Sequence, residues 1–396
     1  MTVSSVSDVA SGCSGEGRQT IYLDHSATTP VDPRVADEVM HYMVEEFGNS
    51  GSRTHAFGQR AKERVNRARR EVAEVVSAQP DEVIFTSGAT ESNNLAILGL
   101  GAFGEEANRK HIVSTQIEHK AVLEPLNVLA QRGFEVELIP PTRGGWVDPG
   151  HLLARVRDDT LLVSVMAANN ETGVLQPVSE IAQGLSTRDT YLHVDAAQAF
   201  GKVVDPLRNS RIDMLSVSGH KIGGPKGIGA LITRRRGYKR PPLAPMMFGG
   251  GQERGLRPGT VPVPLVAGIG LASTLALEEC KEREESCKFV KDSLVRALEG
   301  LGARFNGDLD RSLSTVVNFS IKGIDAEAAI VALKDVVAIS NGSACTSNSY
   351  TRSHVLIAAG ISAEQVDGAL RISWSAKSQI PASWIIEKLE QIQTKG

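Results

Sequence analysis

Cysteine is scarce in this sequence. The chain of 396 residues contains four cysteines, Cys13, Cys280, Cys287 and Cys345. No two of them form a CxxC pair and no histidines stand at the spacing of metal ligands, so neither a disulfide framework nor a metal site is expected. Cys345 differs from the other three, which we expect to be incidental. It lies in the polar stretch SNGSACTSNSYT, whose small residues offer no apolar face against which a thiol could pack. The sequence predicts an arm there that carries a nucleophile.

A strong charge of one sign and long apolar runs are also missing. The formal net charge is −3, which gives no basic footprint for gripping nucleic acid. No apolar stretch approaches the ~20 residues that span a membrane. Residues 1–18 form a Ser/Gly-rich leader, expected to be disordered, without the apolar region of a signal peptide. We therefore expect a cytoplasmic chain that contacts neither membrane nor nucleic acid directly.

Strand and helix signals alternate from about residue 82 to residue 231. Seven segments indicate strands: VIFTS, HIVSTQ, FEVELIP, LLVSVMA, YLHVDA, MLSVSG and GALITRR. This order predicts an α/β fold with a mostly parallel seven-stranded sheet covered on both faces. From about Ala272 the pattern changes to one long charged helix, LALEECKEREESCKFVKDSLVRALEGL, and then to short strands near residues 315–321 and 336–339. The second pattern predicts a smaller α+β domain.

An acidic residue and a lysine occupy positions typical of a ligand site. Asp195 closes the apolar strand YLHVD, and Lys221 follows in the glycine-rich turn SGHKIGGPKG. Doubly wound sheets bind ligands at the carboxyl ends of their strands, and glycines let the backbone approach a ligand closely. A lone aspartate or lysine is usually a surface residue, but a carboxylate for a pyridinium nitrogen and a lysine amine are the pair that a pyridoxal phosphate enzyme needs. Asparagine could not replace Asp195, because only a carboxylate keeps a proton on that nitrogen at neutral pH.

A turn of small residues supplies a candidate phosphate site. The stretch FTSGATESNN indicates the end of a strand, a Ser-Gly-Ala-Thr turn and a helix that begins near Glu91. Unpaired N–H groups and the positive end of the helix dipole favour an anion there. This interpretation places the cofactor phosphate at Ala89, Thr90 and Ser218. An ordinary capped helix start would have the same sequence pattern.

The sequence resembles the cysteine desulfurases, in the class V branch of the fold type I pyridoxal phosphate enzymes. The resemblance runs from Tyr22 to about Trp374 through ordered blocks that include YLDHSATTP, GNSGSRTHAFG, FTSGATESNN, TQIEHKAV, NNETGVLQP, HVDAAQAFGK, SGHKIGGPKGIGAL, GGGQERGLRPGT, NGSACTSNS and LRIS. It implies a large cofactor-binding domain over residues 33–271. Residues 19–32 would join 272–396 in the small domain, which carries the cysteine loop at about residues 340–353.

The resemblance also implies a role for each site residue. Lys221 forms the internal aldimine with pyridoxal 5′-phosphate, Asp195 pairs with the pyridine nitrogen, and His119 stacks on the ring. His220 lies beside the lysine in the cofactor site. Asn170 and Gln198 contact the O3′ side of the ring, and Asn170 also lies at the substrate. Thr260 reaches the phosphate of the neighbouring subunit, which implies a homodimer. Arg371 grips the substrate carboxylate through two parallel hydrogen bonds.

The implied reaction converts L-cysteine to L-alanine. Cys345 attacks the substrate sulfur as a thiolate, becomes a persulfide and passes the sulfur to an acceptor protein. Either His119 or the network around the released thiol accepts the proton of Cys345. The cysteine loop is similar to that of the long-loop, iron–sulfur-assembly group, and the chain also resembles the bacterial desulfurase of DNA phosphorothioation. Iron–sulfur assembly, tRNA thiolation and DNA phosphorothioation stay open as pathways.

Three other functions fit less well. Selenocysteine lyase shares the cofactor site, but the SACTS loop favours the desulfurase. A catalytically idle sulfur-transfer scaffold would not need Lys221, Asp195, His119, Arg371 and Cys345 together. A dinucleotide dehydrogenase is suggested only by Gly99-x-Gly101-x-x-Gly104. That motif follows a helical pattern rather than a strand, and no acidic residue ends a strand at the required distance.

Overall fold

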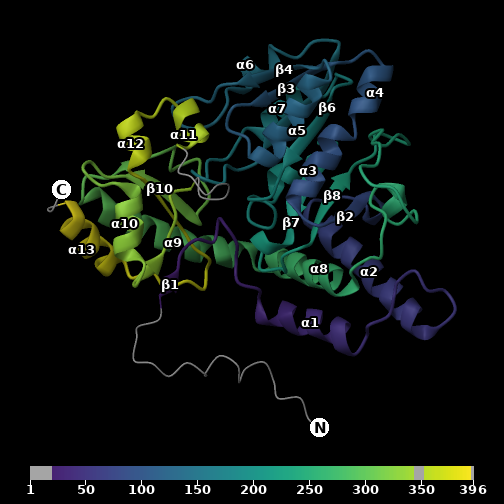
Figure 1. The fold of residues 1–396 in the computed structure, drawn as a ribbon, viewed down its shortest axis with the longest axis horizontal. Coiled ribbons are helices and arrows are strands. Elements are labelled where there is room, and N and C mark those ends of the chain that lie inside the picture. The colour runs from purple at the N-terminus through teal and green to yellow at the C-terminus, as the bar shows by residue number, and fades with distance from the viewer. Residues whose placement is uncertain (1–19, 343–351, 394–396) are drawn as a thin grey trace, which may run out of the picture.

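The computed structural model describes residues 20–342 and 352–393. The leader over residues 1–18 and the thiol of Cys345 lie outside the described residues. Figure 1 shows two parts side by side, a larger one built around a sheet and a smaller one that contains the C-terminal helices.

The larger part contains a seven-stranded sheet with the strand order β2-β8-β7-β6-β5-β3-β4. Its strands are β2 (Val83–Thr86), β3 (His111–Thr115), β4 (Glu135–Ile139), β5 (Thr160–Met166), β6 (Tyr191–Asp195), β7 (Met214–Ser218) and β8 (Gly229–Thr233). Only β8 runs antiparallel to its neighbours, β2 and β7, and every other pair is parallel. The predicted α/β fold with a mostly parallel sheet is therefore confirmed.

Helices cover both faces of this sheet. One face packs on α2 (Ala56–Val75), α7 (Val178–Gly184) and α8 (Val263–Glu278), and α1 (Pro33–Val44) lies on α8. The other face packs on α3 (Ala89–Leu98), α4 (Gly101–Glu106) and α5 (Lys120–Gln131). Successive residues of a strand enter opposite cores, as Ile112 and Val113 of β3 do, because side chains alternate across a strand. The strands therefore read as continuous apolar runs.

The smaller part has a core of its own. An antiparallel sheet in the order β12-β10-β9 consists of β9 (Arg304–Phe305), β10 (Val316–Ser320) and β12 (Ala369–Ser373). Around it lie α9 (Cys280–Glu299), α10 (Ala326–Leu333) and α13 (Ala382–Gln393). The segment β1 (Ile21–Tyr22) pairs in parallel with β11 (Val337–Ala338), and Leu23 enters this second core. The exact domain boundaries given above stay a prediction.

The long charged helix expected near residues 275–301 is wrong as a single element. The chain breaks at Glu279, and α8 and α9 meet at an angle of 70°. Residues of α8 such as Val266 and Ile269 pack in the larger core, whereas Cys287 and Leu294 of α9 pack in the smaller one. The chain must turn between them because the two cores lie in different directions. Among the described residues, no single helix is long and apolar enough to cross a membrane. Within that part of the chain, only α8 and α9 taken together reach the necessary length and apolar composition, and they are bent by 70°.

Candidate functional site

A buried carboxylate lies at the carboxyl end of the central strand β6. Asp195 is 6% exposed and is held by two donors. The side-chain amide of Asn93 on α3 donates to Oδ2 at 2.8 Å, and the backbone N–H of Ala197 donates to Oδ1 at 2.9 Å. Asn93 is itself fully buried. The carboxylate therefore has one fixed orientation at the edge of the sheet.

Lys221 follows the neighbouring strand β7, in the short 3₁₀ turn η4 (Gly219–Lys221). Its Nζ donates to the backbone carbonyls of Ser26 and Ala27, the latter at 2.7 Å. The side chain of Gln198 donates to the same carbonyl of Ser26 at 2.9 Å. Lys221 and Gln198 therefore lie side by side, because both donate to the carbonyl of Ser26.

His119 completes this group from a third strand end, after β3. It is the N-cap of α5, and its Nδ1 accepts a hydrogen bond from the backbone N–H of Ala121 at 3.0 Å. The neutral ring therefore carries its proton on Nε2. Burial lowers the pKa of His119, Asp195 raises it, and Lys221 lowers it further. His119 is therefore a neutral ring, at the same carboxyl edge of the sheet as Asp195 and Lys221.

His220, beside Lys221, is also neutral. Its Nδ1 lies 3.1 Å from the hydroxyl of Thr28, and burial together with nearby lysines lowers its pKa to about 4. His220 thus adds a second uncharged ring, at the segment that also holds the lysine.

The residues predicted to hold the phosphate (the cradle) lie together around the start of α3. The helix begins at Ala89, directly after β2, and no described side chain caps its N-terminus. Ser218, at the end of β7, has its hydroxyl next to Gly88. A side chain at Gly229 would lie 2.6 Å from the Cα of Gly88, so glycine is required where β8 passes this turn. The first-turn amides, including that of Thr90, are left for an anion.

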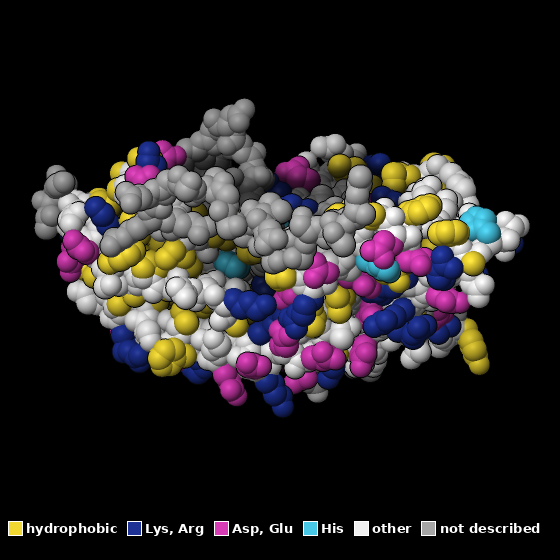
Figure 2. Space-filling model, turned by 90° about the horizontal axis from the view of Figure 1, so that it is seen from below, with side chains coloured by type: hydrophobic (Ala, Val, Ile, Leu, Met, Phe, Trp, Pro, Cys, Tyr) yellow, Lys and Arg dark blue, Asp and Glu magenta, His cyan; other side chains and the backbone are white. Residues whose placement is uncertain are grey.

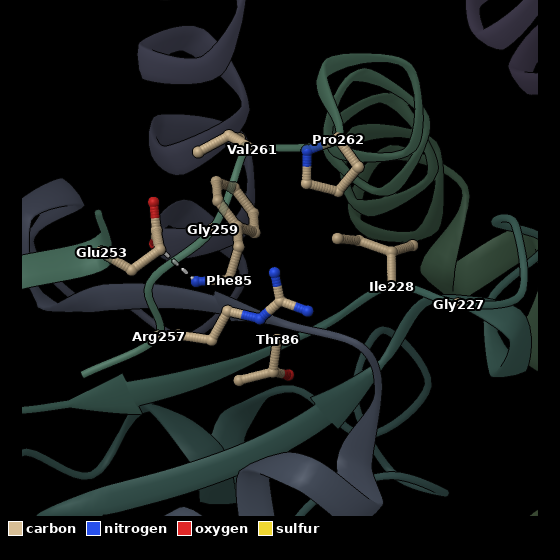
Figure 3. Close-up of a pocket in the computed structure, with 9 residues that line it drawn as sticks. All are labelled: Phe85, Thr86, Gly227, Ile228, Glu253, Arg257, Gly259, Val261 and Pro262. Carbon is tan, nitrogen blue, oxygen red and sulfur yellow. Dashed lines mark hydrogen bonds between the residues drawn. The ribbon is translucent and has the colours of Figure 1, made fainter. Parts of the chain in front are cut away.

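A small pocket adjoins the cradle (Figure 3). The side chain of Arg257 lies above Thr86, the last residue of β2, and its Nε donates to Glu91 of α3 at 3.1 Å. Gly259 and Val261 also line the pocket. Thr260, between them, is exposed. The loop that carries Thr260 is therefore fixed against the cradle, while Thr260 itself is exposed at the surface of this chain.

Arg371 lies on β12 of the smaller part and is 2% exposed. One of its Nη atoms pairs with Asp24 at 2.7 Å, and the other donates to the backbone carbonyl of Asn170 at 2.8 Å. Its Nε has no hydrogen-bond partner among the described residues. The arginine predicted to bind the substrate carboxylate therefore already forms an ion pair with a carboxylate of the protein, that of Asp24.

Glu171 is hydrogen-bonded to one described flank of the segment that contains Cys345 and lies close to the other. The hydroxyl of Ser353 donates to its Oε2 at 2.5 Å, and a side chain at Gly342 would meet its Cβ at 3.4 Å. Glu171 is buried, and burial raises its pKa. Cys345 lies outside the described residues, but both flanks of its segment lie at Asn170 and Glu171, beside Arg371.

Sequence reasoning missed several of these residues. Asn93 could have been found, because it stands about one helical turn after Thr90 of the predicted cradle and so lies on the same side of α3. Asp24 and Ser26 gave no such signal, because their roles depend on how the N-terminal segment crosses the site. Two glycines of the GxGxxG motif, Gly99 and Gly104, have structural roles and do not indicate a dinucleotide site. Gly99 ends α3, and a side chain at Gly104 would collide with Phe134.

Comparisons with known proteins identify the family of the chain. The family model described as aminotransferase class-V matches residues 21–379. Cysteine desulfurase IscS of Escherichia coli O139:H28 (strain E24377A / ETEC) is 45% identical over 356 residues, which cover 89% of this chain and 87% of that protein. The solved structure of DndA from Streptomyces lividans has a TM-score of 0.79 at 52% identity, and covers 89% of this chain and 99% of its own. SspA in complex with cysteine has a TM-score of 0.78 at 35% identity, over 91% of this chain and 100% of its own.

The Asn93–Asp195 hydrogen bond leads to a first prediction. In Asn93→Ala the buried carboxylate loses one of its two donors, and a hydrogen bond to a charged group contributes about 1.5–3 kcal/mol. We expect the free energy of unfolding, measured with urea, to fall by about that amount, and cofactor retention during dialysis to weaken tenfold or more. Asn94→Ala is the matched control, because within residues 20–342 and 352–393 the side chain of Asn94 donates only to the helix carbonyl of Thr90. Equal stability and equal cofactor content in the two variants would contradict the role of Asn93.

Proposed function

The chain belongs to the aminotransferase class-V family and is a pyridoxal 5′-phosphate-dependent cysteine desulfurase, and we propose that sulfur leaves its active site on Cys345. The observation that carries the proposal is that Asp195, Lys221 and His119 lie at the carboxyl edge of one sheet. His354, which follows Ser353 at one flank of the Cys345 segment, reaches this edge, because its Nε2 lies 3.0 Å from the carbonyl of Glu118. L-cysteine is the substrate, in keeping with the relatives named above.

The site residues fit the cofactor. The uncapped start of α3 suits the phosphate, with Ala89, Thr90 and Ser218 around it. Asp195 suits the ring nitrogen, because it is a buried carboxylate with both oxygens oriented. Lys221 would hold the cofactor through its amine, and Asn170 and Gln198 would lie at its O3′ side. When bound, the cofactor supplies an electron sink for breaking bonds at the substrate amino acid.

We propose that His119 acts as a hydrogen-bond donor toward the site. Because Nδ1 is occupied by the N–H of Ala121, the ring presents Nε2–H to the site. Burial disfavours the charged imidazolium, so the ring is a poor acceptor for a further proton. We therefore assign the proton of the Cys345 thiol to the network around the substrate thiol rather than to His119.

Arg371 is the proposed partner of the substrate carboxylate. Its two Nη groups donate to Asp24 and to the carbonyl of Asn170. Its Nε–H has no acceptor among the described residues. Two carboxylates beside one buried guanidinium compete for it. Asp24 therefore keeps the buried arginine paired until a substrate carboxylate shares it.

Cys345 is proposed as the sulfur carrier on the strength of its flanks. Ser353 and Gly342 both lie against Glu171, and the carbonyls of Gly342 and Asn170 both accept from Arg371. The two described ends of the segment that contains Cys345 therefore lie near Arg371, the residue proposed to bind the substrate carboxylate. The thiolate would take the substrate sulfur and leave alanine, with the sulfur bound to Cys345 as a persulfide.

Mass spectrometry tests this role. After incubation with L-cysteine and trapping with iodoacetamide, we expect an extra sulfur atom, about 32 Da, on the peptide that contains Cys345, together with released alanine. Cys345→Ser should bind L-cysteine but form no such adduct and release no sulfide. Cys280→Ser, which removes a half-buried thiol on α9, should behave as the wild type. Sulfide release by Cys345→Ser at the wild-type rate would contradict the proposal.

The sulfur acceptor is proposed to be a protein of DNA phosphorothioation. Identity to DndA, 52%, exceeds identity to IscS, 45%, and the motifs resemble the phosphorothioation desulfurase. Iron–sulfur assembly and tRNA thiolation are the alternatives. Positive and negative side chains are interspersed on the face that Figure 2 shows, and the formal net charge of the chain is −3, so we expect DNA to be reached through the acceptor. The cytoplasmic location stays a prediction.

A homodimer is proposed from exposed apolar side chains and from Thr260. Five apolar side chains on α1, at the start of α2 and between these helices are exposed: Met40, Met43, Val44, Phe47 and Phe57. The rings of Phe47 and Phe57 stack with centroids 5.4 Å apart, and Phe47 is 67% exposed. Exposed apolar clusters of this kind mark association surfaces. Thr260, exposed on a fixed loop, would then complete the phosphate site of the partner subunit.

Subunit mixing tests that contribution. We expect Thr260→Ala to retain the cofactor about tenfold to a hundredfold less well, because a hydrogen bond to a charged group is lost. When Thr260→Ala is refolded together with Lys221→Ala, each mixed dimer should regain one complete site, and alanine production should rise above that of either variant alone. Activity equal to the mean of the two separate variants would contradict a site shared between subunits.

A further inference from the structure

His111 is a fully buried histidine with one unused nitrogen. It begins β3, and its side chain has 0% exposure. Its Nδ1 lies 2.8 Å from the hydroxyl of Thr160 on β5, but Nε2 has no hydrogen-bond partner among the described residues. An unpaired buried polar atom is costly. A bound ligand at Nε2 of His111 would remove this cost.

Two carboxylates stand beside this nitrogen. Glu135 and Glu137 are alternate residues of β4, so their side chains lie on one face of that strand. In the parallel ladder, His111 is paired with Glu135 on one side and with Thr160 on the other. His111, Glu135 and Glu137 therefore lie on one face of the neighbouring strands β3 and β4, at the edge of the sheet, and Thr160 lies beside His111 on β5.

We propose that His111, Glu135 and Glu137 bind a divalent transition-metal ion of the zinc class. A ligand atom of each residue lies within 4.8 Å of the others. The Nε2 of His111 and Oε1 of Glu137 are 3.4 Å apart, longer than an ordinary N–H···O hydrogen bond. Metal–ligand bonds of about 2.0–2.2 Å in tetrahedral geometry separate two ligand atoms by about 3.3–3.5 Å. Imidazole and carboxylate are ligands that zinc accepts.

The second contact of His111 suits this role. Metal-binding histidines commonly donate their other ring N–H to an oxygen, which fixes the tautomer. Thr160 Oγ1 lies where it can accept from Nδ1–H, and it also accepts from the backbone N–H of Arg157. Burial lowers the pKa of His111, so the ring is neutral near pH 7, as a metal ligand must be.

Nearby charges permit a cation. Arg157 forms ion pairs with both Glu135 and Asp159, and Arg155 lies 3.7 Å from Glu137. Because Arg157 has two carboxylate partners, Glu135 can turn toward a metal while Asp159 keeps the arginine paired. Three carboxylates and two arginines leave one negative charge for the cation.

The site would serve the fold rather than the desulfurase reaction. His111 opens β3, whereas Glu118 and His119 follow the other end of that strand. A metal bridging His111 and Glu137 would join the edge strand β4 to β3, at the edge of the sheet away from Asp195. The proposal does not depend on the proposed sulfur pathway.

Equilibrium dialysis with Zn²⁺ tests the site on the holoenzyme. Cys345→Ser serves as the background, so that this thiol binds no zinc. We expect Glu137→Gln to lose one equivalent of Zn²⁺ relative to that background, and Thr160→Val to bind it 10–100-fold more weakly. His151→Gln, an exposed histidine on α6 (Pro149–Leu153), is the control and should keep the equivalent.

The unfolding midpoint gives a second measurement. Zn²⁺ should raise the midpoint of the background and of His151→Gln, because a ligand that binds only the folded state stabilises it. It should raise the midpoint of Glu137→Gln less. His111→Gln should also lose the equivalent, and if it fails to fold, the partly exposed Glu137 still decides the question. Equal zinc content and equal midpoint shifts in Glu137→Gln and His151→Gln would overturn the proposal.

Discussion

The buried carboxylate of Asp195 is the constraint on which the larger part of the structure depends. A charge removed from water is costly unless donors surround it. Asn93 and the N–H of Ala197 supply those donors. For Asn93 to reach β6, α3 must pack close to the sheet, and Gly229 gives β8 room beside the turn that begins this helix. One electrostatic requirement thus positions the cradle, the helix and the strand end together.

The N-terminal segment joins this carboxyl edge to the smaller part of the molecule. The carbonyls of Ser26 and Ala27 hold Lys221, and Asp24, two residues earlier, holds Arg371. Leu23 packs in the smaller core. The lysine and the arginine, which come from different parts of the fold, are therefore fixed relative to each other by one short stretch of backbone.

The strands and the principal site residues could be predicted because they have local causes. Buried parallel strands read as apolar runs; Asp195 ends one of them, and Lys221 lies in the short turn after another. The break at Glu279 could not be predicted, since it depends on the directions of two cores. The pairing of Arg371 with Asp24 and the position of Glu171 depend on contacts between residues far apart in the chain. His111 and Glu137 are likewise brought together only by the register of β3 and β4.

The central claim is that a carboxylate at position 195 is required for chemistry and not only for folding. Asp195→Asn keeps the size of the side chain while removing its charge. The measurement is the rate of alanine formation from L-cysteine, made after cofactor content has been shown to match the wild type. We predict a fall of at least about 100-fold, comparable to the loss of an electrostatic group in other active sites. A rate close to that of the wild type would contradict it.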